Sequence, residues 1–284
     1  MNPSSTSAFF QWWRLTRPWN VLAMGIMVTL VLRWQGFPLM DLMHLGRAGW
    51  VIVPMLVGAA GNLINDYFDI REDRINKPDK ALVGRTVKRR VVLVTHWGFT
   101  AAAIMWSGWL SSHTGATWPM ILVAVFSVVL YLYSPLLKGR GAWGNVAISG
   151  CVAGLVVWGG LAALKGAHAP PSALWMFAGI LGWFNFLREW VKDAQDMEGD
   201  RVANHRTLAI QLTTQQNRFG VIAATILGGS FVIIWSLQMN TSWLMMLPWL
   251  FAYSAALASA MKLKLTRLSA WLKVLIGTLY LFIV

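Results

Sequence analysis

Long apolar runs recur along the whole chain, and they constrain its fold more than any other feature of the sequence. Composition agrees with them, because 57% of the 284 residues are hydrophobic, only 12% are charged and the mean hydropathy is +0.54. Soluble domains carry about 25% charged residues. A helix that crosses a bilayer needs about 20 predominantly apolar residues. We therefore expect an all-α integral membrane protein.

Nine of these runs are expected to cross the membrane. An amphipathic interfacial segment precedes them at residues 1–20, where Pro18 suits the first turn of a helix. Many of the eighteen tryptophans flank the apolar runs, which suits the headgroup level of a bilayer. The expected spans are residues 21–34, 49–64, 91–111, 118–133, 144–164, 173–191, 219–237, 242–261 and 270–284.

The basic residues predict the orientation of these spans. With the N-terminus in the cytoplasm, only Arg33, Arg47 and Lys165 of the 24 lysines and arginines fall in or beside external connections. This asymmetry follows the positive-inside rule. It predicts one membrane-embedded domain over the whole chain, in the cytoplasmic (plasma) membrane, with acidic cytoplasmic caps at residues 65–90 and 192–218. The net charge of +13 does not indicate nucleic-acid binding, because the basic residues lie in loops between spans.

The stretch NDYFDIREDRINKPDK, at residues 65–80, places polar side chains at the end of the second span. Asn65, Asp69 and Asp73 recur every four residues, which stacks them on one face of a helix with neighbouring Cβ atoms about 5–6 Å apart. Carboxylates held this close repel each other unless a cation lies between them, and oxygen ligands suit Mg²⁺. A solvated, charge-rich loop is the alternative, but a loop needs no four-residue period.

A second acidic stretch, REWVKDAQDMEGD, closes the sixth span at residues 188–200. Its acidic side chains on one helical stripe are Glu189, Asp193, Asp196 and Asp200. The two stretches together hold ten of the eleven acidic residues, and only Asp41 lies outside them. Because the stretches lie four spans apart, we expect two parallel four-helix halves plus a ninth helix, with both acidic ends facing one cytoplasmic cavity.

A transporter or cation carrier is the alternative from a different functional class, because acids within membranes often mark ion pathways. Here the acids lie at span ends on one side, and none lies in the middle of a span. Transporters also commonly consist of inverted repeats, whereas the expected halves are parallel. The pattern therefore favours an enzyme.

Four motifs, in this order, resemble those of the UbiA superfamily of intramembrane prenyltransferases. The resemblance covers essentially the whole chain, and the ordered set is far more specific than any one motif. The motifs are Arg17-Pro18-x-Asn20, Asn65-Asp66-x-x-Asp69-x-x-x-Asp73, Tyr133-Ser134-Pro135-Leu136-Leu137-Lys138 with Gly144-Asn145, and Asp193-x-x-Asp196-x-x-x-Asp200.

The resemblance implies transfer of an isoprenyl group from a polyprenyl diphosphate to a lipid or aromatic acceptor, with Mg²⁺ as cofactor. Membrane lipids are expected to surround the protein. It implies metal binding by Asn65, Asp69, Asp73, Asp193, Asp196 and Asp200. It implies catalytic roles for Asp69, Asp73, Asp196, Asp200 and Lys138. It implies substrate contacts for Arg17, Asn20, Tyr133, Lys138, Arg201 and Arg206. Elementary chemistry agrees, because a leaving diphosphate needs its charge neutralised in a cavity shielded from water.

Several of these residues have structural alternatives. Lys138 suits diphosphate binding and a topology anchor equally well, Tyr133 suits an interfacial aromatic belt, and Arg17 suits the membrane edge. Glu72 and Glu198 are expected to be surface charges. No histidine is assigned as a base, because a lone histidine beside basic residues is more often a surface group.

The sequence of residues 73–80 resembles that of the family branch that makes archaeal-type ether lipids. Enzymes of this branch join a geranylgeranyl group to geranylgeranylglyceryl phosphate. The four residues between Tyr133 and Lys138 point the same way, since the 4-hydroxybenzoate enzymes usually have one fewer. Aromatic prenyl transfer in quinone, haem or chlorophyll synthesis is the alternative. The basic connection at residues 77–90 is a candidate receptor for an acceptor phosphate, although topology alone also places charges there.

The sequence departs from the family pattern at two places, and these departures leave the identity of the acceptor open. Asn204 stands where relatives usually have glycine after the second acidic motif. Ala81-Leu82-Val83 replaces the usual proline-rich close of the first.

Overall fold

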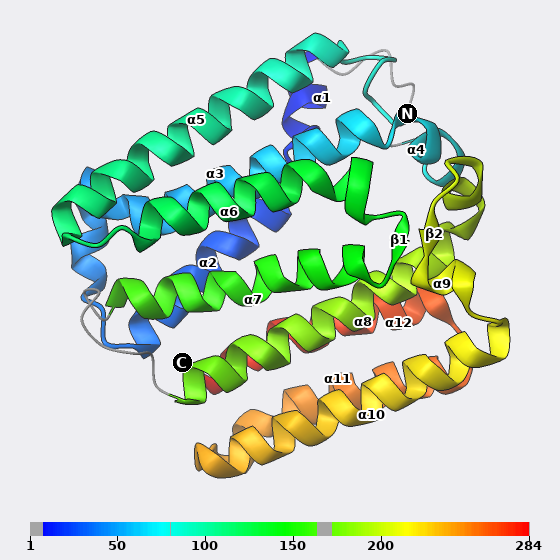
Figure 1. Ribbon diagram of the computed structural model, residues 1–284. Coiled ribbons are helices and arrows are strands. Elements are labelled where there is room, and N and C mark those ends of the chain that lie inside the picture. The colour runs from blue at the N-terminus through cyan, green and yellow to red at the C-terminus, as the bar shows by residue number, and fades with distance from the viewer. Residues whose placement is uncertain (1–7, 80, 164–171, 284) are drawn as a thin grey trace.

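The computed structural model describes residues 8–79, 81–163 and 172–283. Lys80, Lys165 and the last residue of the ninth expected span therefore lie outside the described residues. Helices form almost all of the described chain (Figure 1). In chain order the elements are α1 (Ala8–Leu15), α2 (Pro18–Trp34), η2 (Leu39–Met43), α3 (Leu45–Phe68), α4 (Ile70–Asn76), α5 (Arg89–Thr114), α6 (Trp118–Leu132), η3 (Tyr133–Leu137), β1 (Arg140–Gly141), α7 (Trp143–Ala163), α8 (Ser172–Val202), β2 (Arg206–Thr207), α9 (Leu208–Gln211), α10 (Thr214–Gln238), α11 (Trp243–Met261), α12 (Leu265–Leu279) and η4 (Tyr280–Phe282).

Seven helices within the described residues are long and apolar enough to cross a membrane, and the number is eight if α1 and α2 form one bent span. These two helices meet at 49°, because Arg17 adopts a left-handed backbone (φ 53°) before Pro18 opens α2. The 31-residue α8 falls outside this set, since its C-terminal part carries the second acidic stretch. The all-helical, multi-pass membrane fold is thus confirmed. The count of nine spans in two parallel halves stays a prediction.

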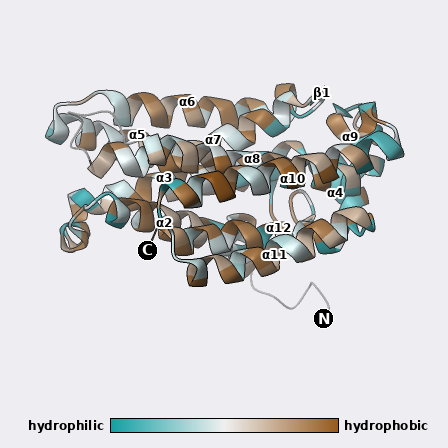
Figure 2. Ribbon diagram, turned by 90° about the horizontal axis from the view of Figure 1, so that it is seen from below, coloured by the Kyte–Doolittle hydropathy of each residue, from teal (hydrophilic) through white to brown (hydrophobic). Residues whose placement is uncertain are grey.

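Large apolar side chains on the outer helices point away from the bundle. Val94 and Met105 on α5 are each 71% exposed, and Phe251 on α11 is 68% exposed. Figure 2 shows hydrophobic residues along the length of the helices and hydrophilic residues gathered towards the ends of the bundle. Monomeric soluble proteins rarely expose contiguous apolar patches this extensive, whereas lipid tails cover such a surface.

The α8 helix lies at the centre of the larger hydrophobic core. It packs against α7, α10 and α12, and Phe177, Leu181 and Phe184 on its inner stripe are fully buried. Their spacing of four and three residues is that of one helix face. In the other core, α3 packs against α2, α5 and α6. These two cores fix the direction in which the acidic ends of α3 and α8 point.

Both acidic helix ends lie at the same end of the bundle, together with α4, α9 and the two short strands (Figure 1). The strands β1 and β2 pair in parallel, with Arg140 opposite Arg206 and Gly141 opposite Thr207. This ladder joins the connection after α6 to the connection after α8. Three segments that are far apart in the sequence therefore meet at this end.

Candidate functional site

The first acidic stretch keeps its helical spacing although the helix is interrupted. α3 ends at Phe68 and α4 begins at Ile70. Across this break the Asp69 amide still donates to the Asn65 carbonyl at 2.9 Å, and the Asp73 amide donates to the Asp69 carbonyl at 2.9 Å. The predicted four-residue stripe is thus present, and its three members line the same large cavity.

The second acidic stretch lies on α8, which continues without interruption through Val202. Glu189, Asp193 and Asp200 are buried, and Asp196 is partly buried. All four line the same cavity as the first stretch. The single-stripe interpretation of their spacing therefore agrees with the structure.

The end of α4 joins the two stretches directly. The Asn76 side-chain amide donates to the Asp196 carbonyl at 3.0 Å, and its side-chain oxygen accepts from the Gly199 amide at 3.0 Å. Lys77 Nζ lies 2.6 Å from Asp196 Oδ2. These three contacts hold the first acidic stretch against the C-terminal turns of α8.

The cavity between the two stretches has a volume of about 1260 Å³, which exceeds the ~300–1,000 Å³ of most small-molecule pockets. Asp41, Asp79 and Glu198 do not line it, so eight of the eleven acidic residues do. The acidic lining residues are Asp66, Asp69, Glu72, Asp73, Glu189, Asp193, Asp196 and Asp200.

Glu198 is exposed as predicted, but the prediction of a surface position for Glu72 is wrong. Glu72 is 4% exposed and lies in the cavity wall, with His205 Nδ1 3.2 Å from its Oε1. The reason is its position three residues after Asp69, which places it on the same face of the helical turn.

Lys138 reaches both acidic stretches from the connection after α6. Its amide donates to the Tyr133 carbonyl at 2.8 Å, a five-residue π-turn that contains Pro135. Its Nζ lies 2.7 Å from Asp69 Oδ2, 3.7 Å from Glu72 Oε1 and 3.9 Å from Asp200 Oδ1. Lys138 therefore lines the cavity between the two acidic stretches, and its role in diphosphate binding stays a prediction.

The same connection also supports one polar residue of each stretch. Ser134 Oγ donates to Asn65 Oδ1 at 2.6 Å, and Asn145 Nδ2 donates to Asp193 Oδ2 at 2.9 Å. Sequence reasoning assigned no role to Ser134. The signal that could have indicated one is a hydroxyl group in a turn at the membrane edge.

The electrostatics of the cavity reflect this crowding of charge. Burial and the neighbouring Asp69 carboxylate raise the pKa of Glu72 and of Asp73 above their ordinary values. Burial alone would lower the pKa of Lys138, but the carboxylates of Asp69 and Glu72 raise it well above its ordinary value. Lys138 is therefore a permanent cation, and the acidic residues need further positive charge to stay ionised together.

The donor atoms of the cavity fit Mg²⁺ that binds together with a phosphate ligand. Among the described residues, no three histidine, cysteine, aspartate or glutamate side chains already converge as metal ligands, and Lys138 and Lys77 pair with Asp69 and Asp196. Asp200 is 1% exposed, and neither of its carboxylate oxygens accepts a hydrogen bond from the described residues. A buried carboxylate without donors is costly, and a cation removes that cost. Mg²⁺ typically uses one or two carboxylates plus substrate phosphates.

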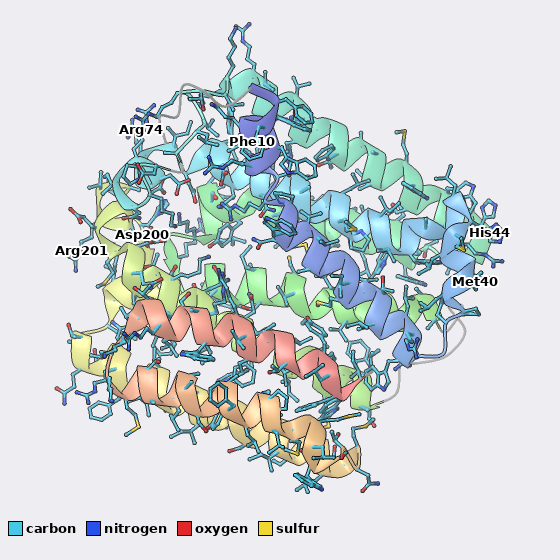
Figure 3. The ribbon with its side chains drawn as sticks, turned by 180° about the vertical axis from the view of Figure 1, so that it is seen from behind. Phe10, Met40, His44, Arg74, Asp200 and Arg201 are labelled. Carbon is cyan, nitrogen blue, oxygen red and sulfur yellow. The ribbon has the colours of Figure 1, made fainter. Side chains whose placement is uncertain are left out.

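The predicted substrate-binding residues divide into two groups. Arg17, Asn20 and Tyr133 line the large cavity, and Arg17 forms an ion pair with Asp66 there. Arg201 and Arg206 are exposed and do not line it. Figure 3 shows Arg201 at the outer edge of the molecule and Asp200 further inside. The structure therefore does not bring these two arginines to the cavity.

A second, mainly apolar cavity of about 480 Å³ adjoins the first. Met24, Met27, Val57, Phe126 and Trp158 are among the residues that line it. Its polar residues are concentrated among those that also line the large cavity. The two cavities thus form one site with a polar chamber and an apolar chamber.

Sequence reasoning missed three basic residues that line both cavities, Arg188, Lys192 and Lys273. Lys273 lies on α12 within a predicted span, and a basic residue inside a membrane segment was the signal that marks it. Arg188 and Lys192 lie within the second acidic stretch, and the sequence analysis assigned roles only to the acidic residues of that stretch.

Comparisons with known proteins identify the family of the chain. Residues 22–283 match the model of the UbiA prenyltransferase family. A digeranylgeranylglyceryl phosphate synthase of Methanoregula boonei is 35% identical over 173 residues, 61% of this chain and 59% of that protein. The chain thus matches less than two thirds of the length of that relative.

Solved structures show the same fold. A digeranylgeranylglyceryl phosphate synthase structure superimposes with a TM-score of 0.65 and 21% identity over 98% of each chain. A UbiA homologue from Archaeoglobus fulgidus, bound to GPP and Mg²⁺, superimposes with a TM-score of 0.57 and 13% identity, covering 94% of this chain and 97% of that one. With the family model matching nearly its whole length, the chain belongs to the UbiA prenyltransferase family.

Proposed function

We propose that this protein transfers a geranylgeranyl group from geranylgeranyl diphosphate to geranylgeranylglyceryl phosphate, in the synthesis of an ether lipid. The observation that carries the proposal is the meeting of two acidic helix ends around Lys138, at the mouth of an apolar chamber. The names of the Methanoregula boonei relative and of the solved synthase support the choice of acceptor.

The reaction balances as a substitution at the allylic carbon C1 of the donor. The C1–O bond breaks, and diphosphate leaves with the electron pair. The free glycerol hydroxyl of the acceptor forms the new C1–O bond and loses its proton. The products are the diether phosphate, diphosphate and one proton.

The residues proposed to hold Mg²⁺ are Asn65, Asp69, Asp73, Asp193, Asp196 and Asp200, and the ions would neutralise the charge that develops on the leaving diphosphate. The Mg²⁺ bound to the Archaeoglobus fulgidus homologue supports this assignment. Lys138 contributes a fixed positive charge between the two acidic stretches. Such preorganised charge, held in a site of low dielectric constant, stabilises a transition state more than it would in water.

The apolar chamber is proposed to hold the isoprenoid tail. Its walls of methionine, valine and aromatic side chains exclude water. Arg17, Asn20 and Tyr133 line both chambers and are proposed to contact the substrate where the diphosphate meets the tail. Exclusion of water also protects the allylic carbon from hydrolysis.

The fold supports a wider proposal about how the chain lies in the membrane. With the bent α1–α2 pair counted as one span and α8 added, nine spans form two parallel four-helix halves plus α12, in a single domain over the whole chain. The acidic end of the bundle then faces the cytoplasm, as the distribution of basic residues indicates.

A panel of acceptors tests the proposed function. Purified protein with Mg²⁺ and labelled geranylgeranyl diphosphate is given geranylgeranylglyceryl phosphate, 4-hydroxybenzoate, homogentisate or dihydroxynaphthoate in separate reactions. We expect labelled product and diphosphate release with the glyceryl phosphate and loss of both in EDTA. Product from an aromatic acceptor alone would overturn the acceptor, and full activity in EDTA would overturn the metal.

A further inference from the structure

A cluster of basic side chains lies at the junction of the two chambers. Among the described residues, those that line both chambers are Arg17, Asn20, Asn65, Tyr133, Arg188, Glu189, Lys192 and Lys273. Four of these are basic and one is acidic. Arg17 pairs with Asp66, which lines the polar chamber only. The other charged residues at the junction are Arg188, Glu189, Lys192 and Lys273.

Glu189 holds two of these basic residues at the junction. Arg188 Nη1 lies 2.8 Å from Glu189 Oε1, and Lys192 Nζ lies 2.7 Å from Glu189 Oε2. The Nε atom of Arg188 is buried and donates no hydrogen bond to the described residues. A buried guanidinium donor without an acceptor is costly, so this group is suited to an anionic ligand.

The basic connection at residues 77–90 is engaged elsewhere. Lys77 pairs with Asp196, the Arg85 guanidinium donates to the Pro78 carbonyl, and Arg89 lies over the Tyr67 ring at 4.6 Å. Among its described residues, none lines the apolar chamber. Lys77 is the basic residue of this connection that lines the polar chamber, among the described residues, and it is paired there with Asp196. The interpretation of this connection as the receptor of an acceptor phosphate stays a prediction.

We propose that Arg188, Lys192 and Lys273 bind the phosphate group of the acceptor. This inference rests on the proposed function and adds the subsite that selects a phosphorylated acceptor. Arg188 and Lys192 place two positively charged groups beside the single carboxylate of Glu189, and a phosphate monoester carries a charge of about −1.5 to −2 at neutral pH.

The position of the cluster favours the acceptor phosphate over the donor diphosphate. The proposed function places the donor diphosphate at the acidic stretches and Lys138. The reacting carbon C1 is bonded to this diphosphate and is the first carbon of the isoprenoid tail. The junction lies where polar chamber becomes apolar chamber. In geranylgeranylglyceryl phosphate the reacting hydroxyl lies within three carbon atoms of the phosphate, so a phosphate held here brings that hydroxyl towards C1.

Steady-state kinetics test this subsite with Arg188→Gln, Lys192→Gln and Lys273→Met. KM is measured for geranylgeranylglyceryl phosphate, for the same lipid without its phosphate, and for the donor. We expect each variant to raise KM for the phosphorylated acceptor by about 10-fold, as the loss of one charged hydrogen bond predicts. The donor KM and the KM for the unphosphorylated lipid should change by less than about two-fold.

Two further variants separate binding from folding. Lys192→Arg keeps the charge and should restore the acceptor KM, and an acceptor KM that stayed raised in this variant would contradict a role of that charge in phosphate binding. Arg267→Gln, on the exposed face of the same helix as Lys273, should leave every KM unchanged.

The results that would overturn the subsite differ from failure of the proposed function. A rise in the donor KM with an unchanged acceptor KM would assign the cluster to the donor diphosphate. A wild-type protein that uses phosphorylated and unphosphorylated lipid equally well would also overturn it. If the wild-type protein makes no ether from either lipid, the proposed function itself fails, and this is seen before any variant is measured.

Discussion

The acidic end of α3 and the acidic end of α8 carry similar side chains but are held in place differently. On α8 the acids belong to one uninterrupted helix whose inner face is buried along its length. After α3 the helix breaks at Asp69, and the seven-residue α4 carries the next acids. That short helix depends on contacts from outside, namely Lys138 on Asp69 and Asn76 on α8.

This difference shows which contacts fix the positions of the acidic side chains in each half of the site. An isolated helix of seven residues is not stable in water, so the position of Asp73 is fixed by tertiary contacts. The α8 acids need only the helix that carries them and Asn145 beside Asp193. We therefore expect equal chemical roles for the two acidic ends but unequal sensitivity to changes in the surrounding residues.

The largest expected effect tests the equality of the chemical roles. Asp69→Asn and Asp196→Asn each remove one charge without changing shape. If both ends grip one diphosphate, each variant should lower kcat by about 10²–10³-fold, the usual cost of losing one group that stabilises transition-state charge. Diphosphate release at saturating Mg²⁺ and donor measures the effect.

Exposed acids provide the controls for that comparison. Asp79→Asn and Glu198→Gln remove a charge from the same two segments, yet neither residue lines the cavity. Both should retain wild-type turnover. If Asp69→Asn alone were inactive and Asp196→Asn fully active, the two ends would not act on one substrate.

The second effect tests the unequal support. Asn76→Ala removes both hydrogen bonds that join α4 to α8, and Gly199→Ala reaches the same contact from the other side, since its Cβ would lie 2.3 Å from Asn76 Nδ2. Each should lower the free energy of unfolding by about 1–3 kcal/mol and lower kcat by about 10-fold through misplaced acids.

Thermal unfolding in detergent and turnover together measure this effect. Gln195→Ala serves as the matched control, because Gln195 is an exposed amide on α8 whose partner is Thr266 rather than α4. Wild-type turnover in Asn76→Ala would show that α4 holds its position without α8.

A smaller effect concerns the positive charge of Lys138, which lies close to acids of both stretches. Burial and Asp69 raise the pKa of Glu72 and of Asp73, and the positive charge of Lys138 opposes this rise. Lys138→Met removes that opposition, so both pKa values should rise further. Because Mg²⁺ binds ionised carboxylates, the acid limb of kcat/KM should move to higher pH.

Normalised pH profiles of the variants measure this shift. Lys138→Arg keeps the charge and should leave the acid limb in place, even where the absolute rate falls. An acid limb that stayed in place in Lys138→Met would show that another cation sets the ionisation of these carboxylates.

The acidic stripes could be predicted because a four-residue period survives the break at Asp69 through the bonds from Asp69 to Asn65 and from Asp73 to Asp69. The junction cluster could not be predicted, because Lys273 and Arg188 line the same cavities only through the packing of α12 on α8. Two local features explain why fewer than nine helices qualify as spans by length and composition within the described residues. Hydropathy does not register the bend at Arg17, and the acids of α8 lower its average.

One departure from the family pattern is explained by packing. Ala81, Leu82 and Val83 are buried, and Leu82 and Val83 pack in a small cluster with Leu15 and Leu63. An apolar segment in place of a proline-rich one therefore anchors the connection after α4 to the helices beneath it. Sequence alone could not show this, because the partners lie 19 to 68 residues away in the chain.

The other departure gives the smallest expected effect and concerns the end of α8. Asn204 has a left-handed backbone (φ 57°), the Asn204 amide donates to the Arg201 carbonyl, and the next amide donates to the Asp200 carbonyl at 2.8 Å. This is a Schellman motif, which favours glycine and tolerates asparagine. Asn204→Ala should therefore lower the free energy of unfolding by about 1 kcal/mol, and Asn204→Gly should leave it unchanged or raise it slightly. Unfolding in detergent measures the difference. Equal stability of the two variants would mean that the left-handed turn does not limit how α8 ends, and the second acidic end would then need support from outside just as the first does.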